Sequence, residues 1–512
     1  MIYRSPYPDV EIPGLTLPEL ILGRARERGD HPALIDAETG GMMTYAQLAE
    51  AVDRLAARLH EDGFAKGEVA ALCTPNRVDF PVAAYAVARL GGIVTTLNPA
   101  FTAEETRRQL DDSGAVIAFT THELAPRFAG LRAVYEFGAA LPAGSRPPAE
   151  VAIDPTSDVV ALPYSSGTTG LPKGVMLTHR NLVAMQVLMG PVEGTTERDV
   201  TAAVLPFFHI YGFSVILALG LYRGATLVVF PRFEMETFLS AIQRYRITRL
   251  PLVPPLLLRL AGDPLVDKYD LSSLRTIISG AAPLAPALAD EVGQRFGCLV
   301  KQGYGLTKLS PGSHMHPEDQ GTPPPGSVGL LHPNTECRIV EGGGAAGGRA
   351  SPGPPEGGPS PHTGEIWVRG PQVMKGYLNQ PEATAEMITP DGWLRTGDIG
   401  RVDERGYLYV VDRLKELIKY KGYQVAPAEL EALLLTHPQV ADAAVIGRAD
   451  TEAGEIPKAF VVPVPDATVS AQDLMDFVAA RVAPYKKVRE VAFVREIPKS
   501  PSGKILRRLL RT

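Results

Sequence analysis

The chain contains few cysteines. Only three occur in 512 residues, at Cys73, Cys298 and Cys337. Three widely spaced cysteines do not form the disulfide framework of a small secreted domain, nor do they supply the clustered ligands of a structural zinc site. We therefore expect three ordinary buried thiols.

The chain also lacks long apolar runs and a strong excess of one charge. No stretch reaches the roughly 18 apolar residues of a membrane helix, and the N-terminal MIYRSPYPDVEIPG has no charged segment followed by an apolar core. The net charge of −6 gives no general electrostatic reason to bind nucleic acid or an anionic membrane. These absences predict a cytoplasmic enzyme, a monomer or weak homo-oligomer, with small-molecule partners and without nucleic acid or membrane.

The composition is that of a folded chain. Hydrophobic residues make up 45% and charged residues 21%, while 50 glycines and 46 prolines indicate many turns. At roughly 150 residues per domain, this length predicts two to four domains.

The segment from Thr44 to Gly63 predicts a helix. Thr44 and Gln47 have the spacing of a capping box, and Gly63 is a stop signal. The apolar residues recur on one helical stripe, at Leu48, Val52, Leu55 and Leu59. A short apolar run at 69–73, a helical pattern at 77–90 and a strand-like run at 93–97 follow.

Strand, helix and strand in this order predict a parallel sheet. The rhythm recurs in β-rich runs at 201–208, 225–230, 246–253 and 274–280. We predict an α/β fold, with a large N-terminal body of several subdomains over residues 1–398. The Gly- and Pro-rich segment 341–362 is expected to be a surface loop.

A different alternation of elements begins after Asp398. Pro427 opens a helical pattern, strands are expected at 440–449 and 458–465, and a helix from Ser470 precedes a last strand at 488–494. We predict a small, mobile α+β C-terminal domain over residues 399–512.

The most informative segment is SSGTTGLPKGV, from Ser165 to Val175. Its glycines let backbone N–H groups approach oxygens closely, its hydroxyls donate hydrogen bonds, and Lys173 supplies positive charge. A loop of this composition taken alone is most often a flexible turn. It is also not a Walker A motif, because Gly174 and not Ser or Thr follows the lysine.

Six further motifs follow in order. They are SGAAP at 279–283, QGYGLT at 302–307, GY ending at Tyr377, TGD at 396–398, DRLKELIK at 412–419 and PKSPSGK at 498–504. Together with the glycine-rich loop they resemble the acyl-adenylate-forming superfamily. The segments LPYSSGTTGLPKGVMLTH and FHIYG resemble most closely 4-coumarate:CoA ligases and cinnamate:CoA ligases.

The resemblance implies an AMP-forming acid:CoA ligase. Such an enzyme uses ATP, Mg²⁺ and coenzyme A: it joins a cinnamate- or 4-coumarate-like acid to AMP, releases pyrophosphate, and then transfers the acyl group to CoA. Two alternatives stay open, a medium-chain fatty acyl-CoA ligase and a catalytically weakened nucleotide-binding relative.

The resemblance also implies roles for individual residues. ATP and AMP are expected at Ser165, Ser166, Gly167, Thr168, Thr169, Lys173, Gln302, Gly303, Tyr304, Thr307, Asp398, Arg413 and Lys504. The acid and the acyl-adenylate are expected at Tyr211, Ala281, Gln302, Gly303, Thr307, Met315, Lys415 and Lys419. Catalytic roles fall to Lys504, His209, Lys419 and Gln424. CoA is expected at Arg232, Lys421 and Gly422, and Lys415 is the expected hinge.

Two parts of the chain, position 308 and positions 311–313, depart from the pattern of the enzymes that it resembles. Lys308 follows Thr307 where the pattern has a glutamate that helps to hold Mg²⁺, which leaves Thr168 as the remaining metal-site residue. Whether Lys308 lowers activity or contacts phosphate directly is undecided by the sequence. Pro311, Gly312 and Ser313 replace bulkier aliphatic residues, so we expect a roomier end of the acid pocket.

Overall fold

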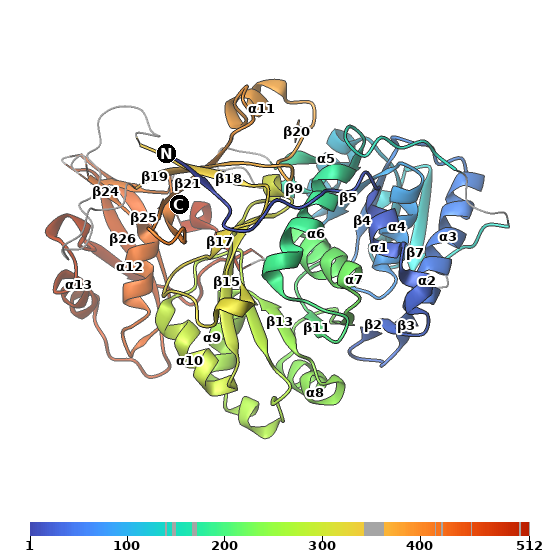
Figure 1. Cartoon of the computed structure of the whole chain (residues 1–512). Helices are drawn as coiled ribbons and strands as arrows, with labels where there is room; N and C mark the ends of the chain where they lie inside the picture. Colours follow the sequence, from blue (N-terminus) through green and yellow to red (C-terminus); the bar gives the residue numbers. More distant parts are fainter. Residues whose placement is uncertain are drawn as a thin grey trace.

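The computed structural model describes most of the chain. The described residues are 1–138, 141–145, 150–165, 172–341, 363–414, 416–420, 423–451, 453–500 and 503–510, without the side chains of Tyr423 and Gln424. The segment expected to be a surface loop, 341–362, lies almost wholly outside them. Figure 1 shows three groups of elements: β4 to β7 with their helices on the right, β11 to β15 below the centre, and the C-terminal strands on the left.

The first sheet has eight strands in the order β20-β10-β8-β5-β4-β6-β7, with β9 paired to β10. The strands are β4 (Val69–Cys73), β5 (Ile93–Leu97), β6 (Ala115–Thr121), β7 (Ala133–Phe137), β8 (Val159–Ala161), β9 (Tyr164–Ser165), β10 (Lys173–Thr178) and β20 (Gly376–Tyr377). Its helices are α3 (Tyr45–Glu61), α4 (Phe80–Arg89), α5 (Ala103–Ser113) and α6 (His179–Glu193). The predicted parallel pairing of residues 69–73 with 93–97 is confirmed.

Helix α3 shows why the local prediction held. Thr44 caps it and forms the capping box with Gln47. Its predicted stripe, from Leu48 to Leu59, is almost fully buried. Each such side chain contributes about 1.5–3 kcal/mol by leaving water, so the stripe fixes the face that α3 turns to the core.

The second sheet has nine strands in the order β17-β16-β15-β14-β13-β11-β12-β2-β3. They are β2 (Pro32–Asp36), β3 (Met42–Thr44), β11 (Val200–Ala203), β12 (Thr226–Val229), β13 (Arg249–Leu252), β14 (Thr276–Ser279), β15 (Leu299–Gly305), β16 (Gly312–Met315) and β17 (Leu330–Leu331). Helical segments accompany them: α1 (Leu17–Leu22), α2 (Ala25–Arg28), the π-helix η2 (Tyr211–Ala218), α7 (Leu219–Arg223), α8 (Met235–Tyr245), α9 (Pro254–Gly262) and α10 (Pro286–Phe296).

A buried ion network ties β15 to the end of α6. Arg249 is fully buried and pairs with Glu193 and Glu318, each at 2.8 Å. The Lys301 ammonium on β15 donates to the Glu193 carbonyl at 2.6 Å. Removing one partner from such a network leaves an uncompensated buried charge, so the network fixes β15 in place.

A third, five-stranded sheet leads to the C-terminal part. Its order is β1-β18-β19-β21-β22. The strands are β1 (Ile2–Arg4), β18 (Glu336–Val340), β19 (Gly364–Arg369), β21 (Leu394–Val402) and β22 (Leu408–Arg413), and α11 (Pro381–Met387) precedes β21. The expected domain boundary at residue 398 falls within β21, and the sheet continues to Arg413.

The C-terminal unit begins its own sheet at Ile418. Its strands are β23 (Ile418–Tyr420), β24 (Tyr423–Val425), β25 (Val440–Asp450), β26 (Gly454–Pro463) and β27 (Glu490–Phe493). Helices α12 (Pro427–Leu434) and α13 (Ala471–Ala479) begin at the predicted Pro427 and after the predicted cap Ser470. This confirms the α+β pattern, and a separate hydrophobic cluster forms its core.

The three cysteines are free, and Cys73 and Cys337 are buried. Among the described residues, every helix is too short or too polar to cross a bilayer.

Candidate active site

The predicted site residues gather at one edge of the second sheet. Strands β11, β12, β13 and β14 are parallel, so their carboxyl ends share this edge. His209 and Tyr211 follow β11, and Ala281 follows β14. The carboxyl edge of a parallel sheet is where ligands bind in open α/β folds.

Strands β14 and β15 bring together three of the residues that were expected at the base of the nucleotide. Gln302 is the register partner of Ser279, and its side-chain oxygen accepts a hydrogen bond from the Leu284 N–H at 3.3 Å. Ala281 adopts a left-handed φ of 69°. A Cβ at Gly303 would lie 3.2 Å from Met315 Cε, so a larger residue there would press on Met315.

Two polar contacts converge on Asp398. The Tyr304 hydroxyl donates to Asp398 Oδ2 at 2.7 Å, and Arg413 Nε lies 3.3 Å from Asp398 Oδ1. Asp398 and Arg413 are register partners on β21 and β22, which explains the pairing. Burial, with the adjacent Asp398 carboxylate, raises the pKa of Tyr304 well above its usual value, so the hydroxyl stays a donor.

Three lysines add positive charge beside this group, and we call Lys173, Lys308 and Lys504 the lysine cluster. Burial and the neighbouring Arg413 lower the pKa of Lys308 to about 8 and that of Lys504 to about 8. Lys173 contributes to the shift of Lys308, and its ammonium lies 5.3 Å from the centre of the Tyr377 ring. Such a concentration of cations around one carboxylate is suited to a polyphosphate.

Lys504 reaches the site from the C-terminal unit. A Cβ at Gly503, whose φ is 77°, would lie 3.2 Å from both Val253 and Pro255, so this loop touches the segment after β13. Arg507 anchors the loop on its other side: its guanidinium pairs with Glu416 at 2.5 Å and Glu431 at 2.7 Å. The PKSPSGK motif did not reveal Arg507, because the residue lies beyond the motif.

The residues present do not form the carboxylate-based magnesium site of the superfamily's pattern. Position 308 holds an ammonium, which cannot ligate Mg²⁺ while charged. Within the described part of the chain, no three His, Cys, Asp or Glu side chains are grouped so as to hold a metal. Thr168, the other predicted metal residue, lies outside the described residues.

An apolar cluster includes residues of β14 and β16. Tyr211 begins the π-helix η2, and its hydroxyl donates to the Ile278 carbonyl at 3.3 Å. A Cβ at Gly280 would lie 3.1 Å from the Tyr211 ring. The cluster comprises Met185, Met189, Val192, Leu219, Ile278 and Met315, with Tyr7, Val215 and Tyr222 packed against it.

His209 is half-buried next to Tyr211. Its Nδ1 accepts a hydrogen bond from the Tyr211 N–H at 3.2 Å. Burial lowers the His209 pKa to about 4, so the imidazole is neutral at pH 7.

The acid pocket was expected to be roomier at Gly312, but neighbouring side chains fill part of this space. A Cβ at Gly312 would lie 3.2 Å from both Met185 Cε and His332 Cε1. His332 is buried, and both its ring nitrogens lack a hydrogen-bond partner within the described structure, as does Gln186 Oε1. Sequence reasoning missed His332, because it belongs to none of the motifs.

Other predicted residues are not joined to this group. Lys419 is exposed on β23, and its N–H donates to Glu455 Oε2 at 2.8 Å. Arg232 is exposed after β12, 3.8 Å from Glu38. Thr307 opens a short 3-10 turn, and the buried Ser165 hydroxyl has no partner among the described residues. Ser166, Gly167, Thr169, Lys415, Lys421, Gly422 and the Gln424 side chain lie outside what the structure describes.

Comparisons with known proteins agree with this geometry. Residues 23–378 match the AMP-binding enzyme family, and residues 429–504 match the AMP-binding enzyme C-terminal domain. A 4-coumarate--CoA ligase 5 of Oryza sativa subsp. japonica is 43% identical, over 100% of this chain and 97% of the relative. The peroxisomal OPC-8:0-CoA ligase 1 of Arabidopsis thaliana is 42% identical, over 99% and 94%.

Solved structures agree as well. ATP-bound MatB from Rhodopseudomonas palustris superposes with a TM-score of 0.86 at 29% identity, over 97% of this chain and 98% of MatB. The anthranilate CoA ligase AuaEII in complex with anthranoyl-AMP gives a TM-score of 0.86 at 26% identity, over 98% and 97%. The chain therefore belongs to the AMP-binding enzyme family, within the acyl-adenylate-forming superfamily.

Proposed function

We propose that this AMP-forming acid:CoA ligase activates a cinnamate- or 4-coumarate-like aromatic acid. In the first step a carboxylate oxygen of the acid attacks the α-phosphorus of ATP, and the bond to the leaving pyrophosphate breaks. In the second step the CoA sulfur attacks the acyl carbon, and AMP leaves. The observation that carries the proposal is the position of Lys504 beside Asp398 and Arg413, because it brings a cation from the C-terminal unit to the residues that we assign to the nucleotide.

The lysine cluster suits the first step. Negative charge shifts from the acid to the pyrophosphate as the α-phosphorus changes partners, and preorganised cations in a dry site stabilise that shift. We assign Lys504 to the carboxylate and α-phosphate, and Lys173 with Lys308 to the departing pyrophosphate. Lys308 thus supplies directly the positive charge that a metal ligated at this position would otherwise supply.

The contacts at Asp398 suit the nucleoside. Tyr304 and Arg413 hold the Asp398 carboxylate in place, and we assign its oxygens to accept hydrogen bonds from the ribose hydroxyls. We assign Gln302, Gly303 and Ala281 to the base. We assign Ser165, whose hydroxyl has no partner among the described residues, to the phosphates together with Ser166 to Thr169. Thr307, two residues after the end of β15, is also assigned to the nucleotide.

The buried His332 beside Gly312, which we take as the polar end of the acid pocket, favours an acid with a hydroxylated ring. Burial lowers the His332 pKa to about 3, so the imidazole is neutral and has one donor and one acceptor. An unpaired buried polar group costs about 1–3 kcal/mol, which a phenolic hydroxyl at the far end of 4-coumarate would offset by pairing with it. His209 and Tyr211 then lie near the carboxylate end.

A medium-chain fatty acid is the second candidate. Met185, Met189 and Met315 line the same cluster, and methionine side chains adapt to flexible alkyl chains. An alkyl chain would, however, leave the His332 nitrogens unpaired.

The second step requires a different placement of the C-terminal unit. We assign Lys415 as the hinge between the N-terminal part and the mobile C-terminal part. The boundary between these two parts was first expected at residue 398. Rotation at the hinge carries Lys419 and Gln424 toward the acyl-adenylate and brings Lys421 and Gly422 to CoA, to which we also assign Arg232 of the N-terminal part. A cytoplasmic location and a monomeric or weakly associated state also stay predictions.

The test is thioester formation with 4-coumarate, cinnamate and octanoate, on the native chain and on His332→Leu. We expect 4-coumarate to give the highest kcat/KM, and His332→Leu to shift the ratio about tenfold toward cinnamate. Met189→Leu, which keeps the volume and changes no polar group, should leave the ratio unchanged. A preference for octanoate would contradict the aromatic assignment, and an unchanged ratio in His332→Leu would contradict the polar end.

A further inference from the structure

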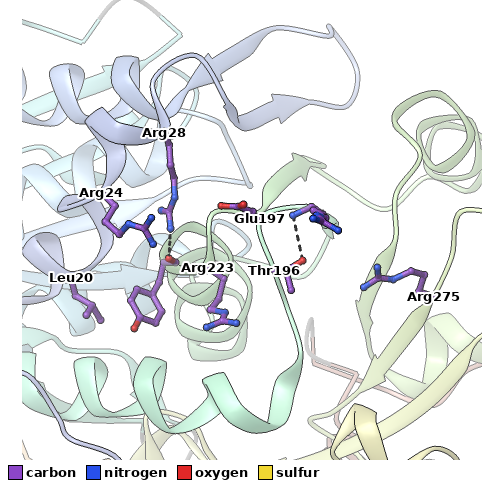
Figure 2. A pocket seen from close by; sticks show the side chains of 9 residues that line it. Leu20, Arg24, Arg28, Thr196, Glu197, Arg223 and Arg275 are labelled. Carbon is purple, nitrogen blue, oxygen red and sulfur yellow. Dashed lines mark hydrogen bonds between the residues drawn. The ribbon is translucent and has the colours of Figure 1, made fainter.

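A second pocket lies apart from the active site and is lined mainly by arginines. Its cavity volume is about 570 Å³, within the range of roughly 300–1,000 Å³ typical of small-molecule sites. Figure 2 shows side chains from well-separated segments around it. The lining residues are Leu20, Arg24, Arg28, Thr196, Glu197, Arg198, Tyr222, Arg223 and Arg275. We call this the arginine pocket.

The arginine pocket lies at the opposite edge of the second sheet from the active site. Arg198 precedes β11, Arg223 precedes β12 and Arg275 precedes β14. These strands are parallel, so the three residues mark their amino ends, whereas His209 and Ala281 follow the carboxyl ends. The arginine pocket is thus a site of its own and not an extension of the ATP or acid site.

Two of the guanidinium groups are held by backbone carbonyls. Arg28 donates to the carbonyls of Leu221 and Tyr222, each at 2.8 Å, and Arg223 Nε donates to the Thr195 carbonyl at 2.7 Å. Figure 2 shows Arg28 with a dashed hydrogen bond at its guanidinium group. Carbonyls orient these groups without neutralising them, and both side chains are only half-exposed.

The charges of the arginine pocket are poorly balanced. Arg24 pairs with Glu27 at 3.1 Å and Arg275 with Asp199 at 3.0 Å. In the described structure, no ion pair involves Arg28, Arg198 or Arg223. Glu197 is the single carboxylate among the lining residues. Burial lowers the pKa of Arg28 and the nearby Arg24 adds to this, whereas Tyr45, Glu197 and Glu27 act in the opposite direction.

We propose that the arginine pocket binds a small metabolite with two or more phosphate groups. Guanidinium groups match phosphate oxygens through paired, charge-assisted hydrogen bonds. Here they come from the turn between α1 and α2, from α2, from the loop before β11, from α7 and from the segment before β14. Phosphates on a compact ligand can meet cations from several of these segments at once. A monoanion would leave most of them unmatched.

The volume favours a compact ligand over a polymer. Leu20 and Tyr222 give the pocket an apolar wall next to the guanidinium groups, which suits the carbon frame of a sugar bisphosphate. Inorganic polyphosphate shares the phosphate chemistry without the carbon frame. A sugar bisphosphate and inorganic polyphosphate are therefore distinguishable by experiment as ligands of the arginine pocket.

The test is titration calorimetry on the full chain with fructose 1,6-bisphosphate in one arm and inorganic tripolyphosphate in the other. Saturating AMP occupies the nucleotide site, and no acid is present, so turnover does not interfere. We expect one saturable site per chain. Stronger binding of the sugar bisphosphate indicates a metabolite site, and equal or stronger binding of tripolyphosphate indicates a site for phosphate alone.

Charge reversal at the exposed Arg198 separates this site from general attraction of anions. Arg198→Glu should weaken binding by about tenfold or more. The control is Arg26→Glu, an exposed residue of α2 outside the pocket that lies 3.8 Å from Asp53; it should change binding less than about twofold. Absence of a saturable site, or equal weakening by both variants, would overturn the proposal. Because no turnover is measured, either result leaves the ligase proposal unaffected.

Discussion

Two lysine-bearing segments of the C-terminal unit lie in contrasting environments. The segment around Lys504 touches Val253 and Pro255, and Lys504 shares its electrostatic surroundings with Asp398, Arg413 and Lys308. The β23–β24 hairpin that carries Lys419 is paired only within its own sheet, and the Lys419 side chain is exposed. The Lys504 segment therefore contacts the N-terminal part, whereas the β23–β24 hairpin with Lys419 would need a rotation of the C-terminal unit to do so under the proposed mechanism.

This contrast indicates which half-reaction the structure represents. A lysine at the nucleotide site matches acyl-adenylate formation, since that step requires positive charge at the α-phosphate. An exposed Lys419 matches a thioester step that follows a domain rotation. Variants of the two segments should therefore affect different half-reactions.

The largest effect is expected from Lys504→Ala. Adenylate formation should fall by about 10²–10³-fold or more, because a preorganised cation is lost from the transition state. Thioester formation from supplied acyl-AMP and CoA should be spared. Lys419→Ala is the matched variant and should show the reverse pattern. Equal losses of both half-reactions in Lys504→Ala would refute the division of labour.

Arg507→Gln should loosen the loop that carries Lys504. The change leaves the buried Glu431 without its partner, and breaking such a pair costs about 3–5 kcal/mol. We expect a lower denaturation midpoint for the C-terminal unit and slower adenylate formation. Arg508→Gln changes the exposed neighbouring residue and serves as control. Similar stability in both variants would show that Arg507 anchors nothing.

Gly503→Ala tests the docking of the same loop without removing a charge. A Cβ at this left-handed position would press on Val253 and Pro255, so adenylate formation should fall by about tenfold. Gly406→Ala imposes a similar backbone strain, at a φ of 87°, in a turn away from this contact. Only Gly503→Ala should slow adenylation, as measured by single-turnover pyrophosphate release.

The smallest effect concerns pH. With pKa values lowered to about 8, Lys308 and Lys504 are charged below that pH and lose their protons above it. The kcat/KM for ATP in adenylation should therefore decline as pH rises through about 8. Lys308→Arg keeps its charge, so its decline should be shallower. Identical profiles would show that Lys308 does not face the phosphates.

The sequence predicted the fold well where signals were local. The capping box at Thr44, the buried run at 69–73 and Pro427 each marked an element that the structure contains. The resemblance carried by the motifs assigned Tyr304, Asp398 and Arg413 to the nucleotide, and the structure brings these three side chains together.

Contacts between distant segments were not predictable in this way. His332 faces Gly312 only because β17 pairs with β16, and no local pattern encodes that meeting. The arginine pocket likewise combines residues from Arg24 to Arg275 that no motif links. The glycine at position 312 predicted a roomier acid pocket, but the sequence did not reveal that Met185 and His332 fill part of that space.

The most direct test of the account is pyrophosphate release with ATP, Mg²⁺ and 4-coumarate, by the native chain and by Lys308→Glu. We predict release that depends on the aromatic acid in the native chain, because Lys308 supplies positive charge where a metal-binding glutamate is replaced. Release by Lys308→Glu alone would contradict the account, since it would show that the lysine disables the site.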